Sequence, residues 1–110
     1  MRLLSRLAPL TLVALLAALP AVPDARAGDV DAGRALAERW CTNCHMITPT
    51  QETATAIGVP TFSGIARMSA TTETSLKVFF QSPHVRMPDL HLSLPEIDDL
   101  TAYILSLRGN

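Results

Sequence analysis

The stretch Cys41-Thr42-Asn43-Cys44-His45 organises the fold of this chain. Two thiols stand three positions apart, and an imidazole follows the second one directly. If the segment is helical, the three side chains share roughly one face, because residues three and four apart are neighbours on a helix. Two thiols can then bond the two vinyl groups of a porphyrin while the imidazole binds its iron. The spacing therefore indicates one haem c, held covalently by Cys41 and Cys44, with His45 as an iron ligand.

The first 27 residues have the pattern of a secretory signal peptide. Arg2 and Arg6 give a positive start, residues 7–19 are largely apolar, and Ala25-Arg26-Ala27 has the small-x-small pattern of a cleavage site. We expect cleavage after Ala27 and a periplasmic domain of residues 28–110. The apolar stretch is shorter than the about 20 residues of a membrane span. Contact with the membrane is expected only in the alternative case, in which the leader stays uncleaved as an anchor.

The composition of residues 28–110 limits what the domain can bind. It holds six basic and nine acidic residues, for a formal charge of −3. No basic patch suited to nucleic acid is present. A domain of this size buries a modest apolar core, and domains near this size often depend on a metal or disulfides for stability. A bound haem would supply the missing apolar mass.

Two other uses of the cysteine pair fit the sequence less well. Exported cysteine pairs commonly form disulfides, and Cys-x-x-Cys also occurs in thiol-disulfide exchange proteins. Those proteins carry the motif near a βαβ pattern, and nothing around Cys41 looks like one. A structural zinc site needs four ligands, and the chain has no second cysteine pair.

The pattern of caps and apolar residues predicts an all-α domain with about four short helices. Asp29 is a suitable N-cap for a helix that ends near Trp40, and Ser93 with Glu96 forms a capping box for the last helix. No run alternates in the manner of a strand. Between these two helices we expect a short helix around Phe62, Ile65 and Ala66 and another at Thr72–Gln81. Residues 46–59 and 82–92 are expected to form irregular loops.

A haem bound by His45 needs its other axial position explained. Met46 follows His45 directly and cannot reach the opposite face, and a methionine at a helix end, such as Met68, is more often core filling. Met87 lies in a loop 42 residues after His45, and Pro88 restricts the backbone beside it. Because histidine and methionine are a common ligand pair in electron-transfer haems, we expect Met87 to be the second iron ligand. The remaining candidates are His84, which comes next, and His91.

Residues 28–110 resemble the class I cytochrome c family in its small bacterial, periplasmic form. Gly33 lies eight residues before Cys41, as the helix-crossing glycine of that family does, and Met87-Pro88 resembles the axial methionine loop. Cys41, Cys44 and His45 match the haem-binding motif. The resemblance implies the class I cytochrome c fold, in which short helices surround one covalently bound haem and the first and last helices cross.

The resemblance also implies two specific contacts. The carbonyl of Pro60, in a segment that continues to Gly64, is expected to accept a hydrogen bond from His45 and so orient that ligand. Leu100 and Tyr103 occupy the positions of the last helix that cross the first helix at Gly33. Gly33 taken alone could equally be a tolerated surface glycine.

Two features depart from the family. Ala37 stands where the family often carries an aromatic residue, so Trp40 is expected either against the haem edge or partly exposed. The chain also lacks the lysine ring that some members use to dock acidic partners, since Lys77 is its only lysine. Arg39, Arg67 and Arg86 do not replace such a ring, and strong steering by a basic face is not expected.

These features predict an electron-transfer protein rather than an enzyme. We expect a monomeric one-electron carrier that exchanges electrons with a periplasmic oxidase, reductase or dehydrogenase. No catalytic residues are expected, because no paired carboxylates, nucleophile with its base, or phosphate-binding loop stands in a supporting context. One alternative is a dedicated haem subunit of a periplasmic oxidoreductase complex. A gas-binding or peroxidatic haem protein, which needs an open sixth position, fits less well.

Overall fold

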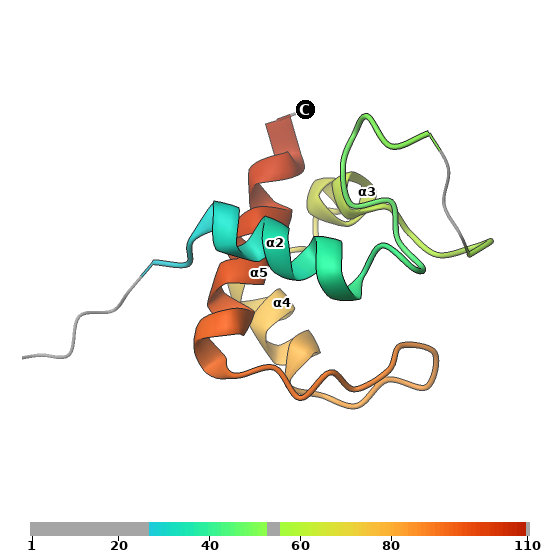
Figure 1. Ribbon diagram of the computed structural model, residues 1–110. Coiled ribbons are helices and arrows are strands. Elements are labelled where there is room, and N and C mark those ends of the chain that lie inside the picture. The colour runs from blue at the N-terminus through green and yellow to red at the C-terminus, as the bar shows by residue number, and fades with distance from the viewer. Residues whose placement is uncertain (1–26, 53–55, 110) are drawn as a thin grey trace, which may run out of the picture.

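Four α-helices and one 3₁₀ turn make up the regular structure of residues 27–52 and 56–109, which the computed structural model describes (Figure 1). No strand occurs among these residues, so the predicted all-α class is confirmed. The predicted signal peptide lies outside the described residues except for Ala27. Within the described part, no helix is long and apolar enough to cross a membrane. The elements are α2 (Val30–Trp40), α3 (Phe62–Arg67), α4 (Glu73–Phe80), α5 (Leu94–Ser106) and η1 (Leu107–Gly109).

The helices begin where the sequence places their caps. The Asp29 carboxylate accepts hydrogen bonds from the first backbone N–H groups of α2, at 2.9 and 3.0 Å. At α5 the Glu96 carboxylate accepts from both the N–H and the hydroxyl of Ser93, at 2.8 and 2.7 Å. Thr72 and Ser75 form a reciprocal capping box at α4. Polar side chains therefore set the start of each of these three helices.

Helix α2 lies across α5, and Gly33 is the residue at the crossing (Figure 1). A Cβ atom at Gly33 would lie 2.0 Å from the carbonyl oxygen of Asp99 and 2.9 Å from Cβ of Tyr103. The backbones therefore approach so closely that only glycine fits. Leu100 is buried in the core beside this point, at 1% exposure. The helix crossing implied by the family resemblance is confirmed.

The core gathers around α5 and continues to the segment that follows α2. The Tyr103 hydroxyl is buried and donates a hydrogen bond of 2.9 Å to the carbonyl oxygen of Ile47. This bond fixes the chain just after the Cys41–His45 motif against the last helix. The buried cluster comprises Ala37, Cys41, Ile47, Phe62, Ala66, Leu76, Leu100, Tyr103, Ile104 and Leu107.

The C-terminal turn is tied to the centre of the molecule by Arg108. Its Nε atom donates to the carbonyl oxygen of Ala66 at 2.9 Å, and its Nη2 atom donates to that of Thr71 at 2.7 Å. These carbonyls lie at and after the end of α3, where a helix leaves its last acceptors without partners. The Arg108 side chain therefore connects η1 to the end of α3 and to the segment that follows it.

Candidate haem site

The Cys41–His45 motif forms a turn directly after α2. Cys41 is the C-cap of the helix, and its carbonyl oxygen accepts from the N–H groups of Cys44 at 3.1 Å and His45 at 2.8 Å. The segment is thus a helical turn rather than part of the regular helix. Cys41 is buried, Cys44 is exposed, and neither is in a disulfide. The disulfide alternative is therefore not supported.

An apolar cavity of about 280 Å³ lies beside this turn. Its walls come from the motif, α3, α4 and the loop after α4, which places it at the centre of the domain. A smaller cavity of about 80 Å³ borders both cysteines and the same loop. The larger cavity is lined by Cys41, His45, Pro60, Phe62, Ile65, Met68, Thr71, Ser75, Leu76, Phe79, Phe80, Met87 and Ile104.

The His45 imidazole is held with one nitrogen available to the larger cavity. Its Nδ1 atom lies 2.7 Å from the carbonyl oxygen of Pro60, so Nδ1 carries the hydrogen and donates it. The neutral ring then has a lone pair on Nε2, which is the form that binds a metal. The Phe62 ring packs against the imidazole, with ring centroids 5.3 Å apart. The Pro60 contact that the resemblance implied is confirmed.

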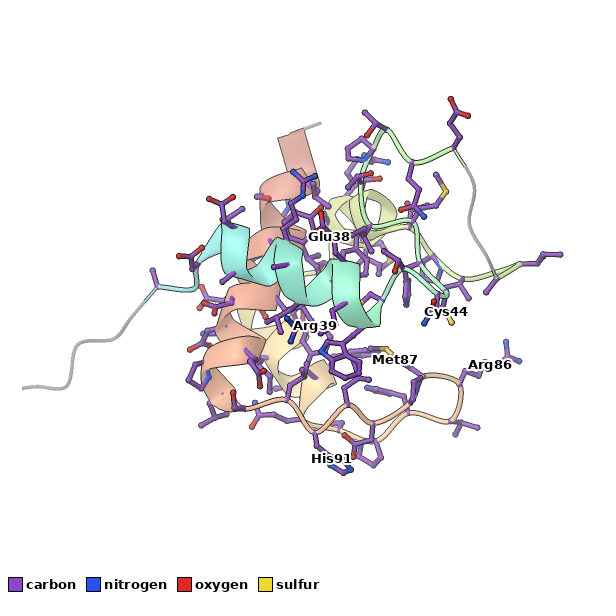
Figure 2. All side chains as sticks on the ribbon, viewed as in Figure 1. Glu38, Arg39, Cys44, Arg86, Met87 and His91 are labelled. Atoms are coloured by element: carbon purple, nitrogen blue, oxygen red, sulfur yellow. The ribbon has the colours of Figure 1, made fainter. Side chains whose placement is uncertain are left out.

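Met87 borders both cavities, as Cys41 and His45 do. Figure 2 shows its side chain turned inwards from the loop, while Arg86 and His91 point away from the molecule. Met68 lines only the larger cavity and is 52% exposed, so it is not the core filling that its position at a helix end predicted. The structure therefore brings the proposed second ligand to the space that His45 also faces.

His84 has other contacts and lines neither cavity. Its ring is stacked on that of Phe79, with centroids 3.7 Å apart and planes at 16°. Its Nε2 atom lies 2.8 Å from the carbonyl oxygen of Phe79, and a carbonyl can only accept, so Nε2–H donates. His84 thus uses the nitrogen that would bind iron in a hydrogen bond to the backbone.

Burial and, to a lesser extent, the neighbouring Cys44 thiol together raise the pKa of the Cys41 thiol to about 11. Thiols that exchange disulfides have the opposite property, a lowered pKa that favours the reactive thiolate. The Cys41 thiol is protonated at neutral pH. Its environment therefore does not fit a thiol-disulfide exchange protein, but it does fit a thioether, which has no proton to lose.

The residues present fit a haem. Its porphyrin needs an apolar cavity, two thiols at one edge and ligands for iron above and below, and imidazole and thioether are both established haem ligands. In the described part of the chain, no group of three or more His, Cys, Asp or Glu side chains could hold a metal ion. A zinc site at these cysteines is therefore not supported among those residues.

Trp40 and the apolar face of α4 complete the site. Trp40 is 51% exposed, which agrees with the expectation of a partly exposed side chain, and it also lines the smaller cavity. Leu76, Phe79 and Phe80 stand at helical spacing on α4, and all three line the larger cavity. Helical periodicity identifies such a face, but it does not indicate whether the face meets core or cofactor.

Comparison with curated proteins gives a relative that covers most of the chain. Cytochrome c-552 from Bradyrhizobium diazoefficiens is 39% identical to this chain over 94 residues, which are 86% of this chain and 89% of the relative. No family model matches the chain. No solved structure matches it significantly.

Proposed function

Because the chain belongs to the class I cytochrome c family of electron-transfer proteins with covalently bound haem c, we propose that it carries single electrons between periplasmic proteins, with His45 and Met87 as axial ligands. The observation that supports this ligand pair is that both side chains border the same apolar cavity, and that Cys41 borders it too. The bound haem supplies a one-electron couple between ferrous and ferric iron.

The protein's own groups would retain the haem and raise its reduction potential. Cys41 and Cys44 retain the cofactor covalently, and the Pro60 carbonyl orients His45 at 2.7 Å. The apolar walls keep water out and disfavour additional positive charge. A methionine ligand raises the reduction potential as well. Both features favour the ferrous form.

Two ligands from the protein would leave no position for a substrate. A gas-binding or peroxidatic protein needs that position open, whereas Met87, which borders both cavities that His45 borders, would close it as the second ligand. A dedicated subunit of an oxidoreductase complex would have the same closed site. The free carrier and the subunit therefore differ in their partner and not in their ligation.

Carbon monoxide binding tests the proposed ligand pair. The test compares variants of Met87 and Met68, which both line the larger cavity. The full chain is produced with haem attachment, and CO binding to the ferrous protein is followed by absorption. We expect wild type and Met68→Ala to bind CO weakly, and Met87→Ala to bind it readily with its haem still attached. Ready binding by wild type, or no change in Met87→Ala, would contradict the assignment.

Export is tested by the mass of the protein recovered from the periplasm. We expect a chain that begins at Gly28 and carries one haem, because Ala25-Arg26-Ala27 has the cleavage pattern. A full-length chain in the membrane fraction would instead show that the leader is an anchor. Co-purification of the periplasmic form with an oxidoreductase would identify a subunit rather than a free carrier.

A further inference from the structure

We propose that His84 is a positioning residue that fastens the ligand loop, residues 82–92, to the end of α4 and thereby keeps Met87 at the iron. The inference rests on the proposed function, because it assumes that Met87 is an axial ligand. It assigns a role to a side chain that the sequence offered only as an alternative ligand.

The first support is the way in which α4 ends. The last carbonyl groups of a helix have no N–H donors within the helix and accept hydrogen bonds from groups beyond it. Gln81 donates its Nε2–H to the carbonyl oxygen of Lys77 at 2.9 Å, and the Ser82 hydroxyl donates to that of Val78 at 2.8 Å. His84 donates to the next carbonyl, that of Phe79, at 2.8 Å, in addition to the backbone N–H of Ser82, which donates to the same oxygen at 3.1 Å. Three side chains thus continue the helix end into the ligand loop.

The second support is the stack between His84 and Phe79. The rings are nearly parallel and 3.7 Å apart, so the imidazole covers one face of the phenyl ring. Phe79 also lines the larger cavity and meets Phe80 edge-on, with centroids 5.7 Å apart. His84 therefore connects the ligand loop to a wall of the site itself.

The third support is what lies between His84 and Met87. Val85 is fully exposed, so its side chain does not pack the loop against the domain. The Arg86 side chain points outwards (Figure 2), although the residue borders the smaller cavity. On the far side of Met87, Leu92 is partly buried and packs against the core. His84 and Leu92 are thus anchors on the two sides of Met87, and the nearer one is three residues away.

Loss of the His84 anchor would widen the range of positions open to the Met87 sulfur. Three residues span at most about 10 Å when extended, so the ligand stays near the iron but is held there less often. An added ligand that competes for the iron measures this directly, because its apparent affinity rises as the site becomes open more often. Loss of one hydrogen bond and one ring contact corresponds to about a tenfold change.

The test compares two histidines of the same loop. His91 is exposed and pairs only weakly within the loop, with Nδ1 at 3.5 Å from an Asp89 carboxylate oxygen, so His91→Ala is the matched control. Imidazole is titrated into the ferric haem-loaded protein, and the loss of the methionine-to-iron absorption band is followed. We expect His84→Ala to bind imidazole about tenfold more tightly than wild type, and His91→Ala to match wild type.

Two further variants separate positioning from general stability. His84→Gln keeps an N–H donor but loses the ring. Phe79→Leu keeps the backbone carbonyl but loses the ring stack. We expect the imidazole affinity of both variants to lie between those of wild type and His84→Ala. Equal imidazole affinities for His84→Ala and His91→Ala would overturn the proposal. If instead Met87→Ala binds imidazole no better than wild type, Met87 is not a ligand and the proposed function fails first.

Discussion

Replacing Gly33 with alanine is expected to force α2 and α5 apart. The added Cβ would lie 2.0 Å from the carbonyl oxygen of Asp99, against about 3.4 Å for an ordinary contact. Because the clashing atom belongs to the backbone of α5, no change of rotamer relieves it. One of the two helices must move by roughly 1 Å or more.

The size of the effect follows from two opposing contributions. Overpacking of this kind costs about 1 to 3 kcal/mol, and a clash with backbone belongs at the upper end. Alanine is favoured over glycine within a helix by about 1 kcal/mol. We therefore expect Gly33→Ala to lower the free energy of unfolding by about 2 kcal/mol. For a domain of this size, that corresponds to a fall in melting temperature of roughly 8 to 16 °C.

The assay is thermal unfolding of the haem-loaded protein, followed by circular dichroism. Gly109→Ala is the matched control, because a Cβ at that position meets no atom within 4 Å. We expect the control to melt within a few degrees of wild type. A Gly33→Ala protein as stable as its control would refute the close crossing of α2 and α5.

Three further substitutions test contacts that hold the site together. Tyr103→Phe leaves the Ile47 carbonyl without its donor and should cost about 1 to 3 kcal/mol in urea unfolding; an unchanged midpoint would contradict the buried bond. Hydrogen bonds from the Ser93 hydroxyl and N–H lower the pKa of Glu96, so its contribution to stability is present above the ordinary pKa of 4.5 and lost as pH falls through the lower native value. The melting temperature of Glu96→Gln should accordingly depend less on pH in that acid range than the melting temperature of wild type. The same fall in melting temperature with falling pH in both proteins would count against the cap. A lysine at position 108 cannot donate from two fixed nitrogens to the carbonyls of Ala66 and Thr71 as Arg108 does. We therefore expect Arg108→Lys to lower the free energy of unfolding by about 1 to 2 kcal/mol in the same urea assay.

Much of the fold could be predicted because its signals are local. Asp29 and Ser93 mark helix starts through hydrogen bonds to residues no more than three positions away. The spacing of Cys41, Cys44 and His45 is equally local, although the motif is a turn that follows α2 rather than part of it. Local patterns of this kind identify the helix starts and the haem-binding residues without knowledge of the tertiary contacts around them.

The contacts that could not be predicted join distant parts of the chain. Arg108 binds carbonyl groups 42 and 37 residues away, and backbone carbonyls carry no signature in a sequence. The role of His84 depends on how α4 ends and on where its ring lies over Phe79. Met68 was expected in the core, but α3 ends with its side chain beside the larger cavity. Only the folded structure shows which contacts the side chains of Arg108, His84 and Met68 make.

Nuclear magnetic resonance of the methionine methyl groups tests the central claim most directly. A methyl group bound above a ferrous haem lies in the ring current of the porphyrin, so its signal moves far upfield of the others. We expect one such signal in wild-type protein labelled with ¹³C at the methionine methyl carbon. It should persist in Met68→Ala and vanish in Met87→Ala. An upfield signal that survives Met87→Ala, or none in wild type, would contradict the assignment of Met87 as the second iron ligand.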